Sequence, residues 1–391
     1  MVDAATTQAA RSGDPVALTR LLVSIPSVNP TLAPGGAGEA EMAVECASLL
    51  EEWGLETGVH ELTPGRSNVV ARLGGEGPTL LLNGHLDTVG VEGMTVPPFS
   101  GALENGRVLG RGSCDMKGGV AALMTVAYRL ARSQRRPNLV VALTADEEHA
   151  SVGMDAFVRS GVQADLAVVC EPTSLKVMPA HKGFVWLKAT FLGKAAHGSR
   201  PDQGVDAIRH AALYLAELDG YGHELRSRPP HPLLEYGSYH AGTISGGTAE
   251  SVYPDRCELL LERRTMPGEE TTEVVAEFQS VLDDLGEREN ELNARLEMTL
   301  DRPGTEVPNE SVLVQGLLRA SAAFDVEPTV EGMTAWVDAA FLNEAGIPAV
   351  CFGPGSIAQA HSADEWIEAE EIRVCADVLE RFALSLLVSA V

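Results

Sequence analysis

Thr79-Leu80-Leu81-Leu82-Asn83-Gly84-His85-Leu86-Asp87, residues 79–87, is the stretch that decides the fold of this chain. Its short apolar run ends in polar and glycine residues, as buried strands in a sheet commonly do. Similar strand-like runs cover residues 68–73, 139–144, 166–170 and 347–352. Amphipathic segments typical of helices lie among these runs, for example at residues 116–132. This alternation predicts an α/β sandwich with a mostly parallel sheet.

A second pattern begins after Gly183. Strand-like and helix-like segments then follow in the order β-α-β-β-α-β, which is the ferredoxin-like order; they cover residues 184–191, 205–218, 238–244, 257–262, 269–285 and 294–300. A chain of 391 residues also exceeds the size at which one hydrophobic core stops growing, about 250 to 300 residues. We therefore expect an α/β catalytic domain, residues 1–182 and 300–391, and an inserted α+β lid or dimerisation domain, residues 183–299.

Residues that bind metal ions follow nearly every expected strand of the first domain. In open α/β sheets such residues converge beyond the carboxyl ends of the strands, however far apart they lie in the sequence. Imidazole nitrogen combined with carboxylate oxygen suits Zn²⁺ first, with Co²⁺ or Mn²⁺ as alternatives. The pattern predicts a site for two divalent ions among His85, Asp87, Asp115, Glu147, Glu148, Glu171 and His361.

Each of these residues also has a simpler interpretation. His85 and Asp87 could form a surface pair, and Asp115 could cap the helix that follows it. Glu171, which precedes a proline, could be a turn residue, and His361 could be a loop histidine. Glu147 and Glu148 could be solvated. If the chain is extended there, however, the two side chains point in opposite directions. One carboxylate could then bind metal while the other takes a proton from water, and the residues alone leave open which does which.

Five motifs, taken in order and spacing, resemble the M20 metallopeptidase family over almost the whole chain. They are GHLDTV (84–89), GSCDMKG (112–118), TADEE (144–148), EPT (171–173) and AHSADE (360–365). The family includes acetylornithine deacetylases, desuccinylases, aminoacylases and glutamate carboxypeptidases. The stretches EPTSL (171–175), AHKG (180–183) and GPGSI (353–357) are most similar to the acetylornithine deacetylase branch.

The resemblance implies a role for each residue of the metal site. Asp115 would bridge the two ions, His85 and Glu171 would complete one site, and Glu148 and His361 would complete the other. Glu147 would be the general base and Asp87 would hold His85. A cis peptide bond between Asp115 and Met116 is also implied.

Three residues of the inserted domain acquire roles from the same resemblance. His197 would reach the active site of the neighbouring subunit and stabilise the oxyanion, so a homodimer is expected; otherwise it is a turn histidine. Arg264 would bind a substrate carboxylate through its bidentate fork, with a surface ion pair to a nearby glutamate as the rival. Relatives commonly carry Asn where this chain has Ser251, so we expect Ser251 to make a shorter-reaching substrate contact.

The expected enzyme is a di-metal amidohydrolase that removes an acyl group, acetyl first, from an N-acyl amino acid such as N-acetylornithine. A desuccinylase, or a dipeptidase or carboxypeptidase acting on a short peptide, is the alternative with the same centre. A catalytically silent binding protein is the alternative outside enzymes, although the complete ligand set speaks against it.

Composition agrees with a cytoplasmic protein that binds neither nucleic acid nor membranes. The net charge of −26 argues against nucleic acid as a partner, because a protein binds phosphates through clustered Lys and Arg. The charge most simply reflects an acidic surface that favours solubility. No apolar run approaches the roughly 18 residues of a membrane helix, and no signal peptide is evident. The six cysteines are scattered singly, so a disulfide framework is not expected.

Overall fold

The computed structural model describes residues 2–387 and divides into two compact units. Unit 1 comprises residues 1–179, 307–331 and 337–391, and unit 2 comprises residues 180–306 and 332–336. The two main divisions fall at 179/180 and 306/307, three and seven residues from the sequence-based boundaries at 182/183 and 299/300. The return of residues 332–336 to the second unit was not expected.

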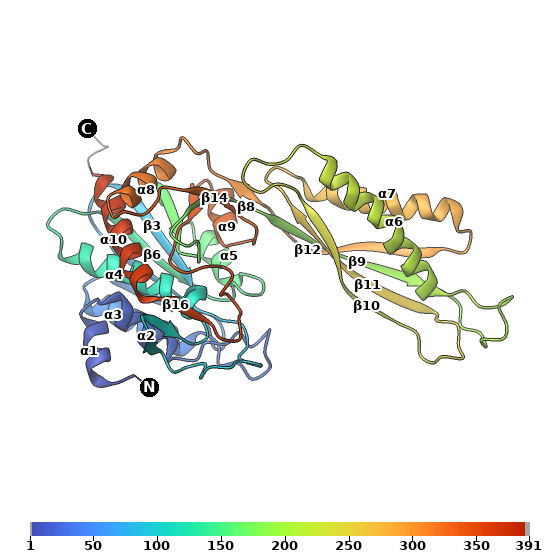
Figure 1. Ribbon diagram of the computed structural model, residues 1–391, viewed down its shortest axis with the longest axis horizontal. Helices are drawn as coiled ribbons and strands as arrows, with labels where there is room; N and C mark the ends of the chain where they lie inside the picture. The colour runs from blue at the N-terminus through green and yellow to red at the C-terminus, as the bar shows by residue number, and fades with distance from the viewer. Residues whose placement is uncertain (1, 388–391) are drawn as a thin grey trace. The chain divides into compact units, whose positions relative to one another are not determined.

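Unit 1 is built on a mixed sheet that includes the strand order β1-β2-β6-β3-β7-β15-β8. Strands β3, β6 and β8 of this sheet are labelled in Figure 1. The central strands β6 (Pro137–Thr144), β3 (Glu76–His85), β7 (Leu166–Val169) and β15 (Ala349–Cys351) run parallel. On either side of this centre, β1 (Glu56–Thr63), β2 (Arg66–Leu73) and β8 (Val177–His181) pair antiparallel. The predicted α/β class with a parallel centre is confirmed, and the antiparallel strands β1 and β8 were not foreseen.

Alternation along β3 explains why helices cover both faces of this sheet. Leu80 and Leu82 belong to the main hydrophobic core, whereas Leu81, which is equally buried, points to the opposite face. The helices that pack into this core are α2 (Pro15–Val23), α3 (Ala40–Glu52), α4 (Gly118–Arg132), α8 (Val312–Ala322) and α10 (Ala369–Ser385). Helices α5 (Val152–Arg159) and α9 (Ala339–Glu344) pack on the strands from the other side (Figure 1).

The remaining elements of unit 1 lie outside the main sheet. Helix α1 (Ala4–Arg11) packs on α2. Helix α2 begins at Pro15 and is capped by Asp14, whose side chain accepts a hydrogen bond from the Ala17 amide. Asp and Pro at these two positions favour a helix start. A small antiparallel sheet contains β4 (Ala102–Glu104), β5 (Arg107–Leu109) and β16 (Trp366–Glu368). A short segment, η1 (Ser113–Lys117), precedes α4, and its backbone is not helical at Asp115 and Met116.

Unit 2 has the expected ferredoxin-like order. Its elements are β9 (Gly183–Leu192), α6 (Ala207–Ser227), β10 (Ser238–Gly246), β11 (Arg256–Thr265), α7 (Thr271–Arg288) and β12 (Asn293–Arg302). The antiparallel sheet has the order β10-β11-β9-β12, and its apolar face packs with α6 and α7 into a separate core. The short strands β13 (Thr305–Glu306) and β14 (Val330–Met333) lie at the divisions between the units in the sequence.

Candidate metal centre

The carboxyl ends of the parallel strands of unit 1 carry the candidate ligands. His85 is the last residue of β3, and Glu147 and Glu148 follow β6 in a tight loop. Glu171 follows β7, and His361 lies in the loop after β15. Because β6, β3, β7 and β15 are neighbours with one direction, these ends meet at one edge of the sheet.

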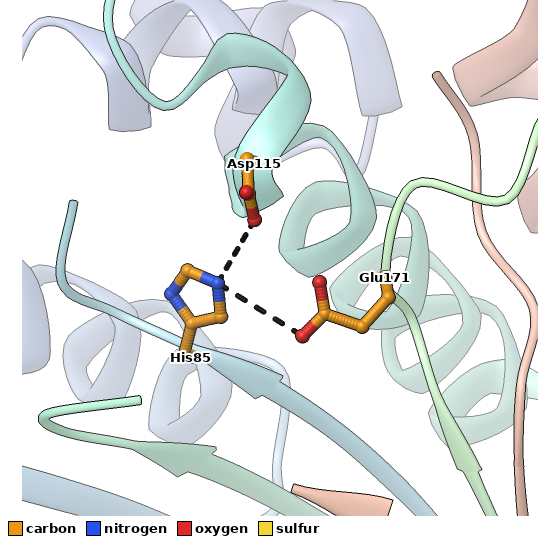
Figure 2. A group of neighbouring side chains, drawn as sticks. All are labelled: His85, Asp115 and Glu171. Carbon is orange, nitrogen blue, oxygen red and sulfur yellow. Dashed lines mark hydrogen bonds and ion pairs between the residues drawn. The ribbon is translucent and has the colours of Figure 1, made fainter. Parts of the chain in front are cut away.

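The first cluster consists of His85, Asp115 and Glu171 (Figure 2). His85 Nε2 lies 3.1 Å from Asp115 Oδ1 and 4.0 Å from Glu171 Oε1. All three side chains are buried and point toward one another from β3, η1 and the loop after β7. The peptide bond between Asp115 and Met116 is cis, as expected.

The second cluster shares Asp115 with the first. His361 Nε2 lies 3.0 Å from Glu148 Oε2 and 3.4 Å from Asp115 Oδ2. The two oxygens of Asp115 therefore face different histidines, one in each cluster. This is the arrangement that a carboxylate bridging two ions requires.

The donor set of both clusters fits divalent cations. In each cluster, one ligand atom from each of the three residues lies within 4.8 Å of the other two. Glu148 Oε1 and Glu171 Oε1 are buried and have no hydrogen-bond partner among residues 2–387, which is costly unless a cation or water satisfies them. Nitrogen from two imidazoles with oxygen from three carboxylates suits Zn²⁺, Co²⁺ or Mn²⁺.

The pKa values of these side chains in the metal-free chain are shifted because the charged groups lie close together in a buried place. Burial raises the pKa of Glu171 to about 8. Hydrogen bonds to Asp115 and Glu148 raise the pKa of His361 to about 10. Burial opposes the charge of His85, yet its bond to Asp115 and the charge of Glu171 raise its pKa well above the ordinary value. Protons on the imidazoles thus balance the carboxylates, and divalent cations would replace those protons on binding.

Glu147 stands beside the clusters without belonging to either. Burial and the neighbouring charge of Glu171 raise its pKa well above the ordinary range of a carboxylic acid. Raised carboxyl pKa values of this kind suit a group that accepts a proton and returns it near neutral pH. The structure therefore separates the adjacent glutamates, with Glu148 beside His361 and Glu147 outside the clusters.

Asp87 makes different contacts from those that the sequence suggested. His85 Nδ1 hydrogen-bonds the backbone oxygen of Asp87 at 3.0 Å, and the Asp87 carboxylate lies farther away, at 3.8 Å. The carboxylate instead accepts hydrogen bonds from the backbone amides of Glu147 and Glu148, at 3.1 and 3.3 Å. Asp87 therefore orients His85 mainly through its main chain and the glutamate loop through its side chain.

Glu365 holds the loop that carries Asp115, a role that the sequence did not suggest. Its buried carboxylate accepts hydrogen bonds from the backbone amides of Gly112, Cys114 and Asp115, at 3.0, 2.9 and 3.1 Å. Arg111 Nη1 donates to the same carboxylate at 2.7 Å. The only hint in the sequence was the place of Glu365 in the motif that contains His361.

Asp338 is a second buried carboxylate that the sequence did not single out. It is 1% exposed, and its Oδ2 accepts a hydrogen bond from Thr144 at 3.0 Å, at the carboxyl end of β6. Burial raises its pKa to about 7, and its charge is felt by Glu147 and Glu171. From sequence, an Asp directly before a short helix is indistinguishable from a helix cap.

The remaining candidates lie in unit 2 and are not part of either cluster. His197 is exposed, and its Nδ1 accepts a hydrogen bond from the Ser199 amide at 3.2 Å. The Ser251 carbonyl accepts a hydrogen bond from the Gly198 amide at 2.7 Å, so the two loops are paired. Arg264 Nε donates to Glu262 at 2.7 Å, which is the ion pair considered as the rival to substrate binding.

No helix between residues 2 and 387 has both the length and the apolar character needed to cross a bilayer.

The model of peptidase family M20/M25/M40 matches residues 81–385. An acetylornithine deacetylase from Myxococcus xanthus is 30% identical over 353 residues, with 88% of this chain and 87% of the relative covered.

Two solved structures share the fold. The M20 family metallo-carboxypeptidase Sso-CP2 from Sulfolobus solfataricus has a TM-score of 0.80 at 18% identity and covers 96% of this chain and 99% of its own. The YXEP protein of Bacillus subtilis, described as a dinuclear metal binding peptidase, has a TM-score of 0.73 at 16% identity, with 97% and 99% covered.

Proposed function

This chain belongs to peptidase family M20/M25/M40, and on that premise we propose that it removes the acyl group, acetyl first, from an N-acyl amino acid such as N-acetylornithine. The observation that carries the proposal is the pair of clusters sharing Asp115, with Glu147 beside them and free of both. Family membership makes the chain a metal-dependent amide hydrolase. The named substrate comes from the acetylornithine deacetylases to which it is similar.

We assign the ligands as they were expected from the sequence. His85 and Glu171 would hold one ion, Glu148 and His361 the other, and Asp115 both, with zinc as the first choice of metal. Bound there, the ions would polarise the acyl carbonyl and lower the pKa of water toward about 7.

Glu147 would carry the proton through the reaction. It removes a proton from the attacking water as the water oxygen bonds to the acyl carbon, and it delivers that proton to the amine nitrogen as the C–N bond breaks. The products are a carboxylic acid and a free α-amino acid. The position of Glu147 next to Glu148 but outside both ligand clusters supports this role, because its carboxylate is then not needed as a metal ligand.

His197 would stabilise the oxyanion in the active site of a partner subunit. Its Nδ1 lies 2.8 Å from Ser199 Oγ and 3.2 Å from the Ser199 amide nitrogen, so the loop engages that ring nitrogen. Nε2 is then the ring nitrogen that would donate to a developing negative oxygen. Arg264 would bind the substrate carboxylate by exchanging its bond to Glu262, and Ser251 would lie beside the His197 loop as a shorter donor.

A homodimer would bring His197 to that site, and the edge strand β10 supports one. Nearly every residue from Ser238 to Gly246 is exposed, and the strand contains no Pro, Lys or acidic residue. Proteins usually protect such an edge because it can pair with another strand. Pairing of β10 with its copy would cover it, and Ile244, which is 53% exposed, would be buried.

A cytoplasmic location completes the proposal. All six cysteines are buried and unpaired, as in proteins kept in a reducing compartment.

The deciding experiment is hydrolysis of a panel by the metal-loaded enzyme. The panel contains N-acetylornithine, other N-acetyl amino acids, N-succinyl and N-formyl amino acids, and dipeptides. Selective release of ornithine supports the proposal. General dipeptide cleavage without release of acetate would replace it with a peptidase.

A further inference from the structure

We propose that Asn29, Arg66, Asp146 and Glu39 form a buried polar support that positions Glu147 and Glu148 through Asp87. The support is defined by these four residues, and it rests on the proposed function only in that Glu147 and Glu148 act as base and ligand. It lies entirely within unit 1. Its four members come from the segment before α3, from β2 and from the loop after β6.

The contact with the catalytic loop is made by Asp87. Its carboxylate accepts the amides of Glu147 and Glu148, and its Oδ2 also accepts Nδ2 of Asn29 at 2.8 Å. The position of the Asp87 carboxylate therefore sets the position of two consecutive peptide groups. Any shift of Asp87 would move the base and the ligand together.

Asn29 ties Asp87 to Asp146. Its single Nδ2 group donates to Asp87 Oδ2 at 2.8 Å and to Asp146 Oδ1 at 3.0 Å. Two buried carboxylates would repel one another without a donor between them. The amide oxygen of Asn29 accepts the Thr31 amide at 2.9 Å, which leaves the NH₂ group directed at the carboxylates.

Arg66 anchors the other end of the support. Its Nε donates to Glu39 Oε2 at 2.7 Å and its Nη2 donates to Asp146 Oδ1 at 2.6 Å. Glu39 in turn accepts the Asp146 amide at 3.2 Å. Side-chain exposure is 9% for Arg66, 0% for Glu39 and 3% for Asp146, so solvent screens these contacts little.

Asp146 also shapes the loop itself. Its φ is +70°, and its carbonyl oxygen accepts hydrogen bonds from the amides of His149, Ala150 and Ser151. The loop thus turns back on Asp146 immediately beside Glu147 and Glu148. A residue that looked from the sequence like part of a generally acidic stretch is the point at which the loop is fixed.

This arrangement predicts unequal effects on the two metal sites. Glu148 is held by the Asp87 carboxylate that Asn29 contacts, whereas His85 bonds only the Asp87 backbone oxygen. His85 and Glu171 make no hydrogen bond to the four support residues in the described chain. Weakening the support should therefore loosen the ion held with His361 more than the ion held with His85.

The test uses Asn29→Ala in the full chain loaded with two zinc ions. Increasing chelator concentrations remove the ions, and zinc retained per chain gives an affinity for each; His361→Ala identifies which step belongs to its site. Outer-shell changes typically weaken metal binding by about 10 to 100-fold. We expect a loss of that size for the Glu148–His361 ion, less than about threefold for the other, and a fall in kcat with little change in KM.

Asn343→Ala is the control, because the Asn343 side chain hydrogen-bonds the backbone of Ala349 at the start of β15, the end of that strand opposite the site. It should leave both zinc affinities unchanged. Arg66→Lys is the second variant, for use if Asn29→Ala folds poorly. It keeps the charge of Arg66 but loses the forked guanidinium, so the zinc affinity of the Glu148–His361 site should fall to a smaller extent.

Unchanged zinc affinities in folded Asn29→Ala, or equal weakening of both ions, would overturn the proposal. The zinc measurement does not depend on the substrate. An enzyme that binds two zinc ions but cleaves no N-acyl amino acid would refute the proposed function and leave the support to be judged on metal affinity alone.

Discussion

Replacing Glu365 tests how strongly the Asp115 loop depends on one buried carboxylate. Glu365→Ala removes the acceptor of four hydrogen bonds, from Arg111 and from the amides of Gly112, Cys114 and Asp115. Arg111 is 3% exposed, and of its side-chain hydrogen bonds within residues 2–387 only the one to the Gly90 carbonyl would remain. Breaking a buried ion pair by removing one partner costs about 3 to 5 kcal/mol. We expect the free energy of unfolding to fall by that amount.

Glu368→Ala provides the matched control. Glu368 and Arg107 form an ion pair of the same 2.7 Å length on β16 and β5, but their side chains are 36% and 44% exposed. Exposed pairs contribute about 0 to 1 kcal/mol. The comparison therefore isolates burial from residue type.

Urea unfolding of the metal-free proteins, followed by circular dichroism, measures both changes without a contribution from bound ions. Glu365→Gln keeps one acceptor oxygen but loses the charge, so it should fall between the other two variants. The reasoning would be refuted if Glu365→Ala and Glu368→Ala destabilised the protein equally.

Three further predictions concern other parts of the molecule. Arg264→Lys loses the bidentate fork, and one charged hydrogen bond is worth about 1.5 to 3 kcal/mol. The KM for N-acetylornithine should therefore rise by about 10-fold or more. An unchanged KM would show that Arg264 forms its ion pair but does not bind the substrate carboxylate. Buried His181 has a pKa lowered to about 4 from 6.5, so the unfolded chain binds the extra proton between these values and stability falls as pH drops through them. Relative to His181→Gln, the wild type should lose up to about 3 kcal/mol between pH 7 and pH 4 in urea unfolding, and parallel pH profiles would contradict this. Chelation should lower the melting temperature, since an ion at 100 times its Kd stabilises the fold by about 2.7 kcal/mol, and an unchanged melting curve would argue against bound metal.

The sequence revealed the elements whose apolar pattern is strong. The buried strand β3 and its polar end at His85 were predictable because parallel central strands are apolar on both faces. The edge strand β1 was missed because its sequence, ETGVHELT, is largely polar and its residues are mostly exposed. An edge strand with one solvated face gives no continuous apolar run, so periodicity alone cannot find it.

The residues of the candidate site also differ in how readily the sequence reveals them. Candidate metal ligands such as His85 and Glu171 can be recognised from the sequence, because their residue type at the end of a strand has few other uses. Glu365 and Asn29 act through contacts that join segments 250 and 58 residues apart, and no local pattern marks such contacts. The contact of the Asp87 side chain with the glutamate loop likewise depends on how β3 and β6 are aligned.

Glu147→Gln in the metal-loaded enzyme tests the central claim most directly. The amide keeps the size of the carboxyl but cannot take a proton from water. Two metal ions should remain bound per chain, while ornithine release from N-acetylornithine falls by about 10² to 10⁴-fold, the usual contribution of a general base. Normal turnover in a variant that still binds both ions would contradict the claim that Glu147 carries the proton.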